Sequence, residues 1–173
     1  MLRWWVGFLG MVVVSLAQAA VKTEEVRYPA DGVMLNGFLA YDDALPGKRP
    51  AVLVVHEWWG HNEHARTSAR KLAEMGYVAL AVDMYGDGKK AEHPADAQKM
   101  VQEVRKNSGI EQQRFAAALQ FIQSRPEVAA DQTAAIGYCF GGSVVLNMAR
   151  LGLDLDGVAS FHGSLGTATP ALA

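Results

Sequence analysis

The residues best suited to covalent chemistry lie in the hexapeptide Gly-Tyr-Cys-Phe-Gly-Gly at residues 137–142, which holds the only cysteine of the chain. A short apolar run, residues 133–136, precedes it, and a helix-like segment, residues 143–149, follows it. A nucleophile at a strand-to-helix turn lies in a tight elbow, where small residues are needed because the backbone folds back on itself. The start of the helix also brings the positive end of its dipole to Cys139 and favours the nucleophilic thiolate. The pattern predicts a cysteine nucleophile; the alternative is a buried structural cysteine.

A second set of candidates follows the apolar run at residues 51–56, which is typical of a central parallel strand buried on both faces. Glu57 closes this run, at the strand end where α/β folds bind their ligands. We interpret Glu57 as a functional carboxylate, with a solvated carboxylate near the start of a helix as the alternative. The two tryptophans that follow, Trp58 and Trp59, either wall an apolar pocket or cover the end of the sheet.

The histidines near this run are not expected to bind a metal. His61 and His64 lie three residues apart, but no acidic or histidine partner stands at the spacing of a metal site. Both are therefore predicted to lie on the surface near the start of a helix. His56 and His93 do not complete a metal site with them. Asp83 is expected to order the turn that follows it rather than to act as an acid or base.

The elements that must position these residues alternate between strands and helices. Asp31-Gly32 is a hairpin-turn signal between two strand-like segments. Further along, apolar runs alternate with segments whose apolar residues recur at helical spacing. The expected strands are residues 24–28, 33–41, 51–56, 77–82, 133–136 and 155–161, and the expected helices are residues 64–75, 95–106, 111–124 and 143–150. This order predicts an α/β fold with a mostly parallel sheet and helices on both faces.

The composition and the N-terminal sequence indicate where the protein is located and which partners it has. The net charge is −2 and no basic tract is interleaved with aromatic residues, so nucleic acid is not expected as a partner. Residues 1–19 have a positive start, an apolar stretch and the small-residue signal Ala-Gln-Ala, which predict a secretory signal peptide and an exported protein, periplasmic or secreted. The apolar stretch is too short to span a bilayer, so no membrane span is expected after cleavage. Residues 20–173 are expected to form one domain.

The last expected strand, residues 155–161, is followed only by loop-like sequence. It would be an apolar edge strand with no helix after it, an arrangement that natural proteins avoid. We therefore expect the domain to be incomplete at its C-terminus.

Residues from about 24 to 173 resemble the dienelactone hydrolase family, a branch of the α/β-hydrolase fold. The resemblance rests on the hexapeptide around Cys139, on His-Glu-Trp-Trp-Gly at residues 56–60 and on Asp-Met-Tyr-Gly-Asp-Gly at residues 83–88. It implies a Cys-His-Asp triad with Cys139 as the nucleophile, and an acid and a histidine that lie beyond residue 173. It further implies an oxyanion hole made by the backbone N–H groups of Phe140 and Trp58, and a role for Glu57 in contacting the cysteine of the resting enzyme and helping to deprotonate it.

The resemblance also bears on the substrate pocket. Trp59, Tyr85 and His162 are candidates for lining it, since His162 ends the strand directly after Cys139 and the triad base belongs further on. Family members that act on dienelactone use an arginine shortly after the fourth strand, where this chain has Asp87. Lys89 is the nearby cation that could take its place, without planar bidentate geometry.

The function expected from these residues is hydrolysis of a carboxylic ester or lactone, a small-molecule substrate, through a thioester acyl-enzyme. No metal and no organic cofactor is expected. The alternatives are a non-catalytic binding protein on a hydrolase scaffold, and a thioesterase or acyltransferase. Because the implied triad acid and histidine are missing, residues 1–173 alone are expected to have little activity. Substrate identity and oligomeric state stay open.

Overall fold

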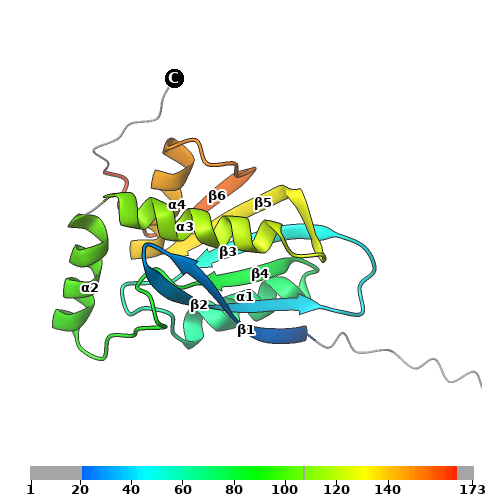
Figure 1. Cartoon of the computed structure of the whole chain (residues 1–173), viewed down its shortest axis with the longest axis horizontal. Helices are drawn as coiled ribbons and strands as arrows, with labels where there is room; N and C mark the ends of the chain where they lie inside the picture. Colours follow the sequence, from blue (N-terminus) through cyan, green and yellow to red (C-terminus); the bar gives the residue numbers. More distant parts are fainter. Residues whose placement is uncertain (1–20, 107, 167–173) are drawn as a thin grey trace, which may run out of the picture.

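The computed structural model of the chain describes residues 21–106 and 108–166 (Figure 1). The predicted signal peptide, residues 1–19, lies outside this part. Within the described residues, six strands form one sheet and four helices pack around it.

The sheet has the strand order β1-β2-β4-β3-β5-β6. Its strands are β1 (Val21–Ala30), β2 (Val33–Asp42), β3 (Arg49–Val55), β4 (Val78–Val82), β5 (Val128–Tyr138) and β6 (Gly157–Phe161). β2 pairs antiparallel with both β1 and β4, whereas β4, β3, β5 and β6 run parallel to one another. The mostly parallel sheet expected from the sequence is confirmed.

The hairpin of β1 and β2 turns at Asp31 and Gly32, whose φ angles are 52° and 74°. Two consecutive left-handed residues make the turn whose twist matches that of the paired strands, and Asp-Gly is a preferred sequence for it. Cross-strand pairing then runs from Ala30 and Val33 at the turn to the far ends of both strands.

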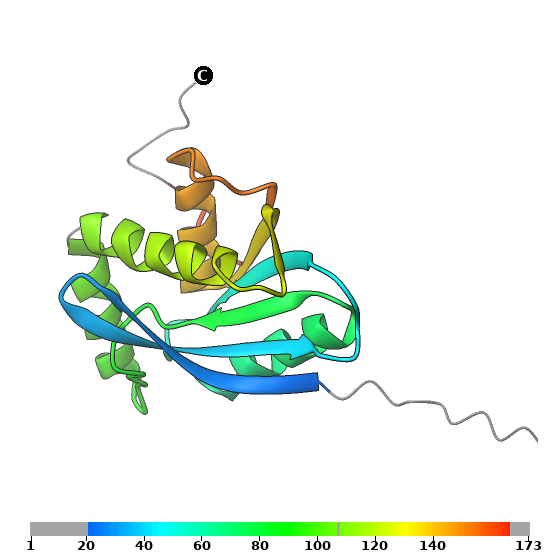
Figure 2. The ribbon, with the colours of Figure 1, turned by 45° about the vertical axis from the view of Figure 1, so that its right-hand side comes forward.

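Helices cover both faces of the sheet, as Figure 2 shows. They are α1 (Glu63–Glu74), α2 (Pro94–Lys106), α3 (Ser108–Gln123) and α4 (Phe140–Arg150). α1 packs against β2, β3 and β4 on one face, while α3 and α4 pack on the other, with α4 against β3, β5 and β6. α2 packs chiefly on α3 and stands at one end of the molecule, away from the middle of the sheet.

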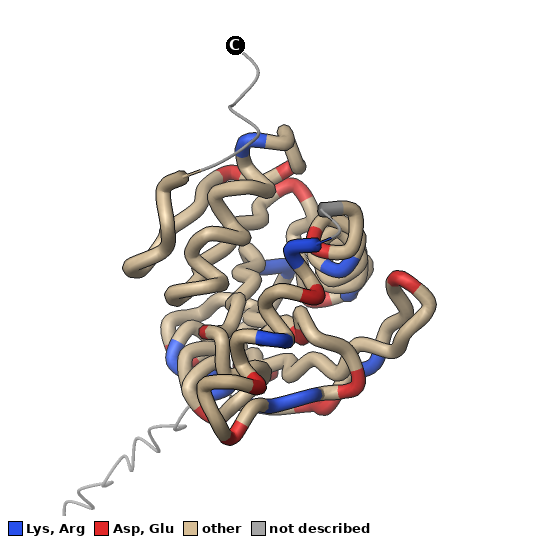
Figure 3. The backbone as a smooth tube through the Cα atoms, turned by 90° about the vertical axis from the view of Figure 1, so that its left-hand side faces the viewer, with Lys and Arg blue, Asp and Glu red and all other residues tan. Residues whose placement is uncertain are grey.

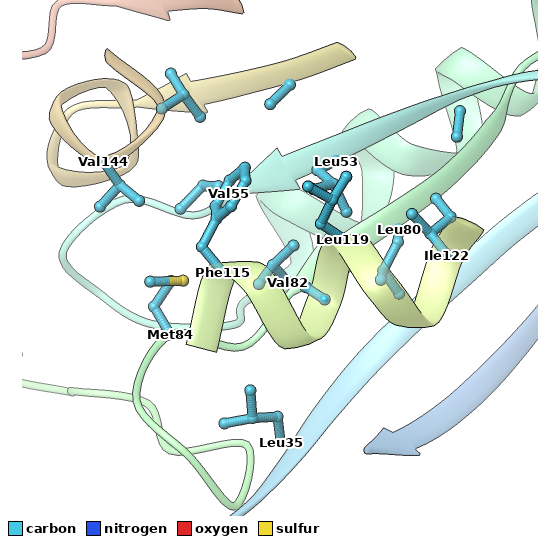
Figure 4. Packing of buried hydrophobic residues seen from close by; sticks show 14 of the residues in the cluster. Leu35, Leu53, Val55, Leu80, Val82, Met84, Phe115, Leu119, Ile122 and Val144 are labelled. Atoms are coloured by element: carbon cyan, nitrogen blue, oxygen red, sulfur yellow. The ribbon is translucent and has the colours of Figure 1, made fainter. Parts of the chain in front are cut away.

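Two hydrophobic cores result from the alternation of side chains along the central strands. The larger core lies between the sheet and α3 and includes, as Figure 4 shows, Leu53, Val55, Leu80, Val82, Phe115, Leu119 and Ile122. Each such buried leucine or phenylalanine contributes about 2–3 kcal/mol. The smaller core lies under α1, whose fully buried residues are Ala65, Ala69 and Ala73. Their small side chains let this helix lie close to the sheet.

β5 is longer than the sequence predicts, because it begins at Val128 rather than at residue 133. Its register against β3 shifts between Arg49 and Ala51, and residues 130–132 of β5 are exposed there. Exposed polar residues at this irregularity break the apolar pattern, which hides the first part of the strand from sequence-based prediction.

The prediction that His61 lies on the surface is wrong. Its ring is buried, and Nε2 lies 3.1 Å from the carbonyl oxygen of Ala81 in β4. Burial and the neighbouring Arg66 lower the pKa of His61, so the ring stays neutral as a packing element. His64 is exposed as expected and packs edge-on against Tyr138.

Acidic and basic residues are interspersed along the described backbone without a long run of either sign (Figure 3). Exposed ion pairs such as Arg70–Glu63 contribute about 1 kcal/mol at most. Among the residues that the structure describes, none of the helices has the length and apolar character needed to cross a membrane.

Candidate active site

Cys139 lies at the turn between β5 and α4 with φ 54° and ψ −110°, a backbone conformation that residues with a side chain rarely adopt. Such strain costs about 1–3 kcal/mol and is found mainly at functional sites. Its thiol makes no capping bond to the helix, and the side chain is partly exposed. The elbow predicted from the hexapeptide is therefore present, with the sulfur left free.

The three glycines of the elbow are required by close backbone contacts. A Cβ on Gly137 would lie 2.1 Å from the carbonyl oxygen of Gly141, and a Cβ on Gly141 would lie 2.4 Å from that of Val55. A Cβ on Gly142 would lie 2.6 Å from Oγ of Ser160. The first turn of α4 therefore packs directly on the ends of β3 and β6. The sequence predicts such close contacts, because the backbone is expected to fold back on itself at this turn.

The loop after β6 is held against the same helix. The N–H of Cys139 donates to the carbonyl of Phe161 (2.9 Å), and the N–H of Ser164 donates to Oγ of Ser143 in α4 (3.0 Å). His162 lies between these two bonds with a left-handed φ of 46°. These contacts bring His162 to the cavity that Cys139 faces.

The loop after β3 lies beside the elbow on its other side. The N–H of Gly141 donates to the carbonyl of His56 (3.1 Å), which fixes the chain just before Glu57 and Trp58. Within the described part of the chain, no acceptor is found for the N–H of Phe140 or of Trp58. Both backbone donors that the family resemblance implies for an oxyanion hole therefore have no partner among the described residues.

His56 ties the loops after β3 and β4 together. The N–H of Met84 donates to Nε2 of His56 (3.2 Å), so the ring proton lies on Nδ1 and is donated to the carbonyl of Glu57. Burial lowers the pKa of His56 to about 4, which keeps the ring neutral and able to act as both donor and acceptor. Rings of Tyr85 and Phe140 pack against it, at 4.8 Å and 5.9 Å between ring centroids.

Tyr85 adds a second tie between these loops. Its hydroxyl donates to the carbonyl of Trp58 (2.9 Å), and Tyr85 as a whole residue is 5% exposed. Next along the chain, the N–H of Ala91 donates to the carbonyl of Trp59 (2.9 Å), and Gly60 bridges to Lys90. The carbonyl groups of Trp58 and Trp59, both on the C-terminal side of the Trp58 N–H, are therefore held by the loop after β4.

The loop after β4 is itself organised by one buried carboxylate. Asp83 is fully buried and accepts four backbone N–H groups, those of Tyr85 and Gly86 at one oxygen and those of Asn36 and Gly88 at the other. The distances range from 2.7 Å to 3.1 Å. Asp83 orders the turn, as the sequence predicts.

Replacing Tyr85 with phenylalanine is expected to lower the free energy of unfolding by about 1 kcal/mol, because the partly buried carbonyl of Trp58 loses its donor. Urea unfolding measures the change. Tyr77→Phe is the matched control, since no hydrogen bond of the Tyr77 hydroxyl is found in the described part of the chain. Equal losses in the two variants would show that the bond to Trp58 contributes nothing.

An open cavity of about 900 Å³ lies over the elbow. Its lining on the elbow side includes Trp58, Cys139, Phe140, Ser143 and His162. Of the other residues singled out in the sequence, Trp59 packs edge-on against Trp58 (5.0 Å), and Tyr85 lies beneath the lining. Neither Trp59 nor Tyr85 is among the described residues that line this cavity.

Glu57 is half-buried and directly precedes Trp58, but it is not among the described residues that line the cavity. Among the described hydrogen bonds, its carboxylate makes none with Cys139. The structure thus places Glu57 in the loop after β3, beside the elbow, and does not show the contact with Cys139 that the family resemblance implies.

Another part of the cavity lining was missed by sequence reasoning. It is formed by α2, which presents Gln98, Val101, Gln102, Arg105 and Lys106. The helical periodicity predicted α2 itself, but no sequence signal tells which cavity its polar face meets. Among the described residues, no cluster of three or more histidine, cysteine or acidic side chains is arranged to hold a metal ion.

The chain matches known proteins over most of its length. A model of the dienelactone hydrolase family matches residues 35–172. The chain is 32% identical over 143 residues to a protein of Aquifex aeolicus named "Putative carboxymethylenebutenolidase", covering 80% of this chain and 60% of that protein. A similar match, 30% identical over 151 residues, is found with a protein of the same name from Synechocystis, covering 83% of this chain and 60% of that one.

Solved structures share the fold. The structure titled m3DLH has a TM-score of 0.82 at 38% identity and covers 85% of this chain, which spans 61% of its length. A dienelactone hydrolase-like promiscuous phosphotriesterase from metagenomic libraries has a TM-score of 0.81 at 36% identity, with 86% of this chain and 63% of that chain covered. The chain thus spans about 60% of the length of the relatives it matches. Because the family match includes the cysteine elbow and both loops that adjoin it, this chain belongs to the dienelactone hydrolase family.

Proposed function

We propose that the protein hydrolyses carboxylic esters or lactones, with Cys139 as the nucleophile. The observation that carries this proposal is the strained elbow, which places the thiol at an open cavity beside two N–H groups for which residues 21–106 and 108–166 offer no acceptor. The carboxymethylenebutenolidase name of the Aquifex aeolicus relative supports ester or lactone cleavage.

The proposed reaction has two stages. The thiolate of Cys139 forms a C–S bond to the substrate carbonyl, whose oxygen takes up the displaced electron pair. The oxyanion then collapses, the C–O bond to the alcohol breaks, and the alcohol leaves with the proton that the Cys139 thiol gave up. Water attacks the resulting thioester, which releases the acid and restores the thiolate.

The N–H groups of Phe140 and Trp58 are proposed to bind the oxyanion in both stages. Where one such donor has been removed from other enzymes, the cost is about 3–4 kcal/mol of transition-state stabilisation. The hydrogen bonds of His56 to the carbonyl of Glu57 and of Tyr85 to the carbonyl of Trp58 support this role. They hold the peptide groups on both sides of Trp58 before substrate binds.

Glu57 is proposed to take the thiol proton in the resting enzyme, directly or through a water molecule. Its place between His56 and Trp58 supports this assignment. The triad histidine and its acid are proposed to come from loops beyond the described residues, with His162 lining the pocket. Residues 1–19 are proposed to direct export as a signal peptide.

The proposal predicts that p-nitrophenyl acetate acetylates the wild-type chain at Cys139. We expect a burst of about one p-nitrophenolate per chain at neutral pH, followed by slow turnover, because acylation needs only the thiolate and the oxyanion donors. Stopped-flow absorbance measures the burst, and mass spectrometry of peptides locates the acetyl group. No burst, or an acetyl group elsewhere than on Cys139, would contradict the proposed nucleophile.

A further inference from the structure

Arg114 is a buried cation that the proposed reaction does not use. It belongs to α3 and is 8% exposed. Its Nη1 donates to the carbonyl of Met84 in the loop after β4 (2.8 Å), and its Nη2 pairs with the carboxylate of Asp31 at the hairpin turn (3.2 Å). A hydrogen bond from a charged donor is about twice as strong as a neutral one. Arg114 therefore holds the loop after β4 against α3 and the hairpin.

The carbonyl of Met84 depends on this arginine. Asp83 accepts the N–H groups of Tyr85 and Gly86, which follow Met84 in the chain. Among the described hydrogen bonds, however, the one from Arg114 is the only one to the carbonyl of Met84. Loss of Arg114 would thus free one residue of a loop that is otherwise held by Asp83.

The residue that Arg114 holds is also bound to His56. Met84 and His56 are both fully buried, and the N–H of Met84 donates to Nε2 of the ring (3.2 Å). Burial lowers the pKa of His56 to about 4, which keeps the ring neutral. In a neutral imidazole one nitrogen accepts and the other carries the proton, so the proton lies on Nδ1. The position of Met84 therefore determines which nitrogen of His56 is the donor.

His56 in turn holds the peptide group that carries one proposed oxyanion donor. Its Nδ1–H donates to the carbonyl of Glu57 (2.5 Å), and the N–H of the same peptide group belongs to Trp58. A trans peptide group is planar, so its C=O and N–H point in opposite directions. The Glu57 carbonyl also accepts the N–H of Gly60, over a longer distance of 3.3 Å. The ring of His56 is therefore the stronger of the two restraints on the direction of the Trp58 N–H.

We propose that Arg114 is a positioning residue for the oxyanion hole. It holds Met84, and Met84 keeps the proton of His56 on Nδ1. His56 then aims the N–H of Trp58 at the oxyanion of a substrate bound to Cys139. This inference rests on the proposed roles of Cys139 and of the Trp58 N–H. A buried arginine also stabilises the fold, so the test must detect an effect that lost stability alone does not produce.

The first test compares two reactions of the same sulfur. Acetylation by p-nitrophenyl acetate passes through an oxyanion, whereas alkylation by iodoacetamide displaces iodide and forms none. The ratio of the two rate constants is therefore independent of the thiolate fraction and reports on the oxyanion hole. Removing a whole donor costs about 100–1,000-fold in other enzymes, and Arg114→Met should leave the Trp58 N–H present but less well aimed. We expect this variant to lower the ratio by about tenfold.

The matched control is Arg125→Met. Arg125 is partly buried and forms ion pairs with Glu24 and Glu127, both at 3.3 Å. It lies just before β5, whereas Cys139 follows the other end of that strand. The control should therefore lose stability and keep the wild-type ratio.

Arg114→Lys tests the bond to Met84 more directly, because lysine keeps a cation that can donate to this carbonyl but lacks the planar fork of arginine. It should recover most of the ratio that Arg114→Met loses. A wild-type ratio in Arg114→Met, or an equal fall in Arg125→Met, would overturn the positioning role.

A second measurement does not depend on the reactivity of the thiol. Nitrogen NMR of isotopically labelled chain distinguishes protonated from unprotonated ring nitrogens, and the signals of His56 are assigned by their absence from His56→Gln. We expect the proton on Nδ1 in the wild type and a partly protonated Nε2 in Arg114→Met. A wild-type proton on Nε2 would reject the relay even if Arg114→Met fails to fold.

The two measurements also separate this inference from the proposed function. If neither iodoacetamide nor p-nitrophenyl acetate modifies Cys139 in the wild type, the proposed nucleophile is wrong. The NMR comparison then decides alone whether Arg114 controls the proton of His56, and identical ring shifts in the wild type and Arg114→Met would reject that control.

Discussion

Replacing Cys139 with alanine is expected to slow acetyl transfer from p-nitrophenyl acetate by at least about 1,000-fold, because the proposed C–S bond can no longer form. Alanine accepts the left-handed backbone at this position no better and no worse than cysteine does. The free energy of unfolding should therefore stay within about 0.5 kcal/mol of the wild-type value. Stopped-flow release of p-nitrophenolate and urea unfolding measure the two quantities.

Two controls sharpen this result. Wild-type chain alkylated with iodoacetamide keeps the native backbone and should lose the burst as completely as Cys139→Ala does. Cys139→Ser keeps a small polar side chain but should also lose most of the burst, since an unactivated hydroxyl is a far weaker nucleophile than a thiolate. A burst that survives in Cys139→Ala would mean that another residue accepts the acetyl group.

Replacing Asp83 with alanine is expected to lower the free energy of unfolding by about 4 kcal/mol. Four backbone N–H groups lose their acceptor, and two of these hydrogen bonds are fully buried. Hydrogen bonds to a charged acceptor contribute about 1.5–3 kcal/mol each, and water entering the emptied site offsets part of the loss. Because domains of this kind are stable by about 5–15 kcal/mol, the variant should lose about a quarter or more of its free energy of unfolding.

Asp83→Asn should fall between the wild type and Asp83→Ala, since the amide keeps one acceptor oxygen and turns the other into a donor. Asp131→Ala is the control: this aspartate is exposed in β5, and its loss should change stability by less than about 0.5 kcal/mol. Urea unfolding followed by circular dichroism compares the three variants. Similar values for Asp83→Ala and Asp131→Ala would refute the organising role of Asp83.

The elbow and the hairpin could be predicted from sequence because short-range sterics determine them. Asp31-Gly32 takes the left-handed turn that its residue types favour, and Gly137 and Gly141 stand where a Cβ would meet backbone. In both cases the residues that meet are near in sequence or in adjacent strands. Alternating apolar runs then give the order of strands and helices, which the structure confirms.

Contacts between distant loops could not be predicted in this way. His61 precedes a helix like many surface residues, and only the folded chain brings it to Ala81 in β4. The bond from Tyr85 to the carbonyl of Trp58 joins two loops that follow different strands. Likewise, the periodicity of α2 shows which residues share a face, but only the folded chain brings Arg105 to the cavity that Cys139 lines.

Because α2 packs on α3 and away from the middle of the sheet, its sequence can change independently of the residues around the elbow. The groups proposed to do the chemistry are held by the ends of β3, β4 and β5, whereas α2 packs chiefly on α3. Substitutions on the cavity face of α2 can therefore accumulate without disturbing the elbow or the loops tied by Asp83. Directed evolution of the cavity should therefore start with the polar positions of this helix, because they line the cavity and lie outside the packing between the elbow and the sheet.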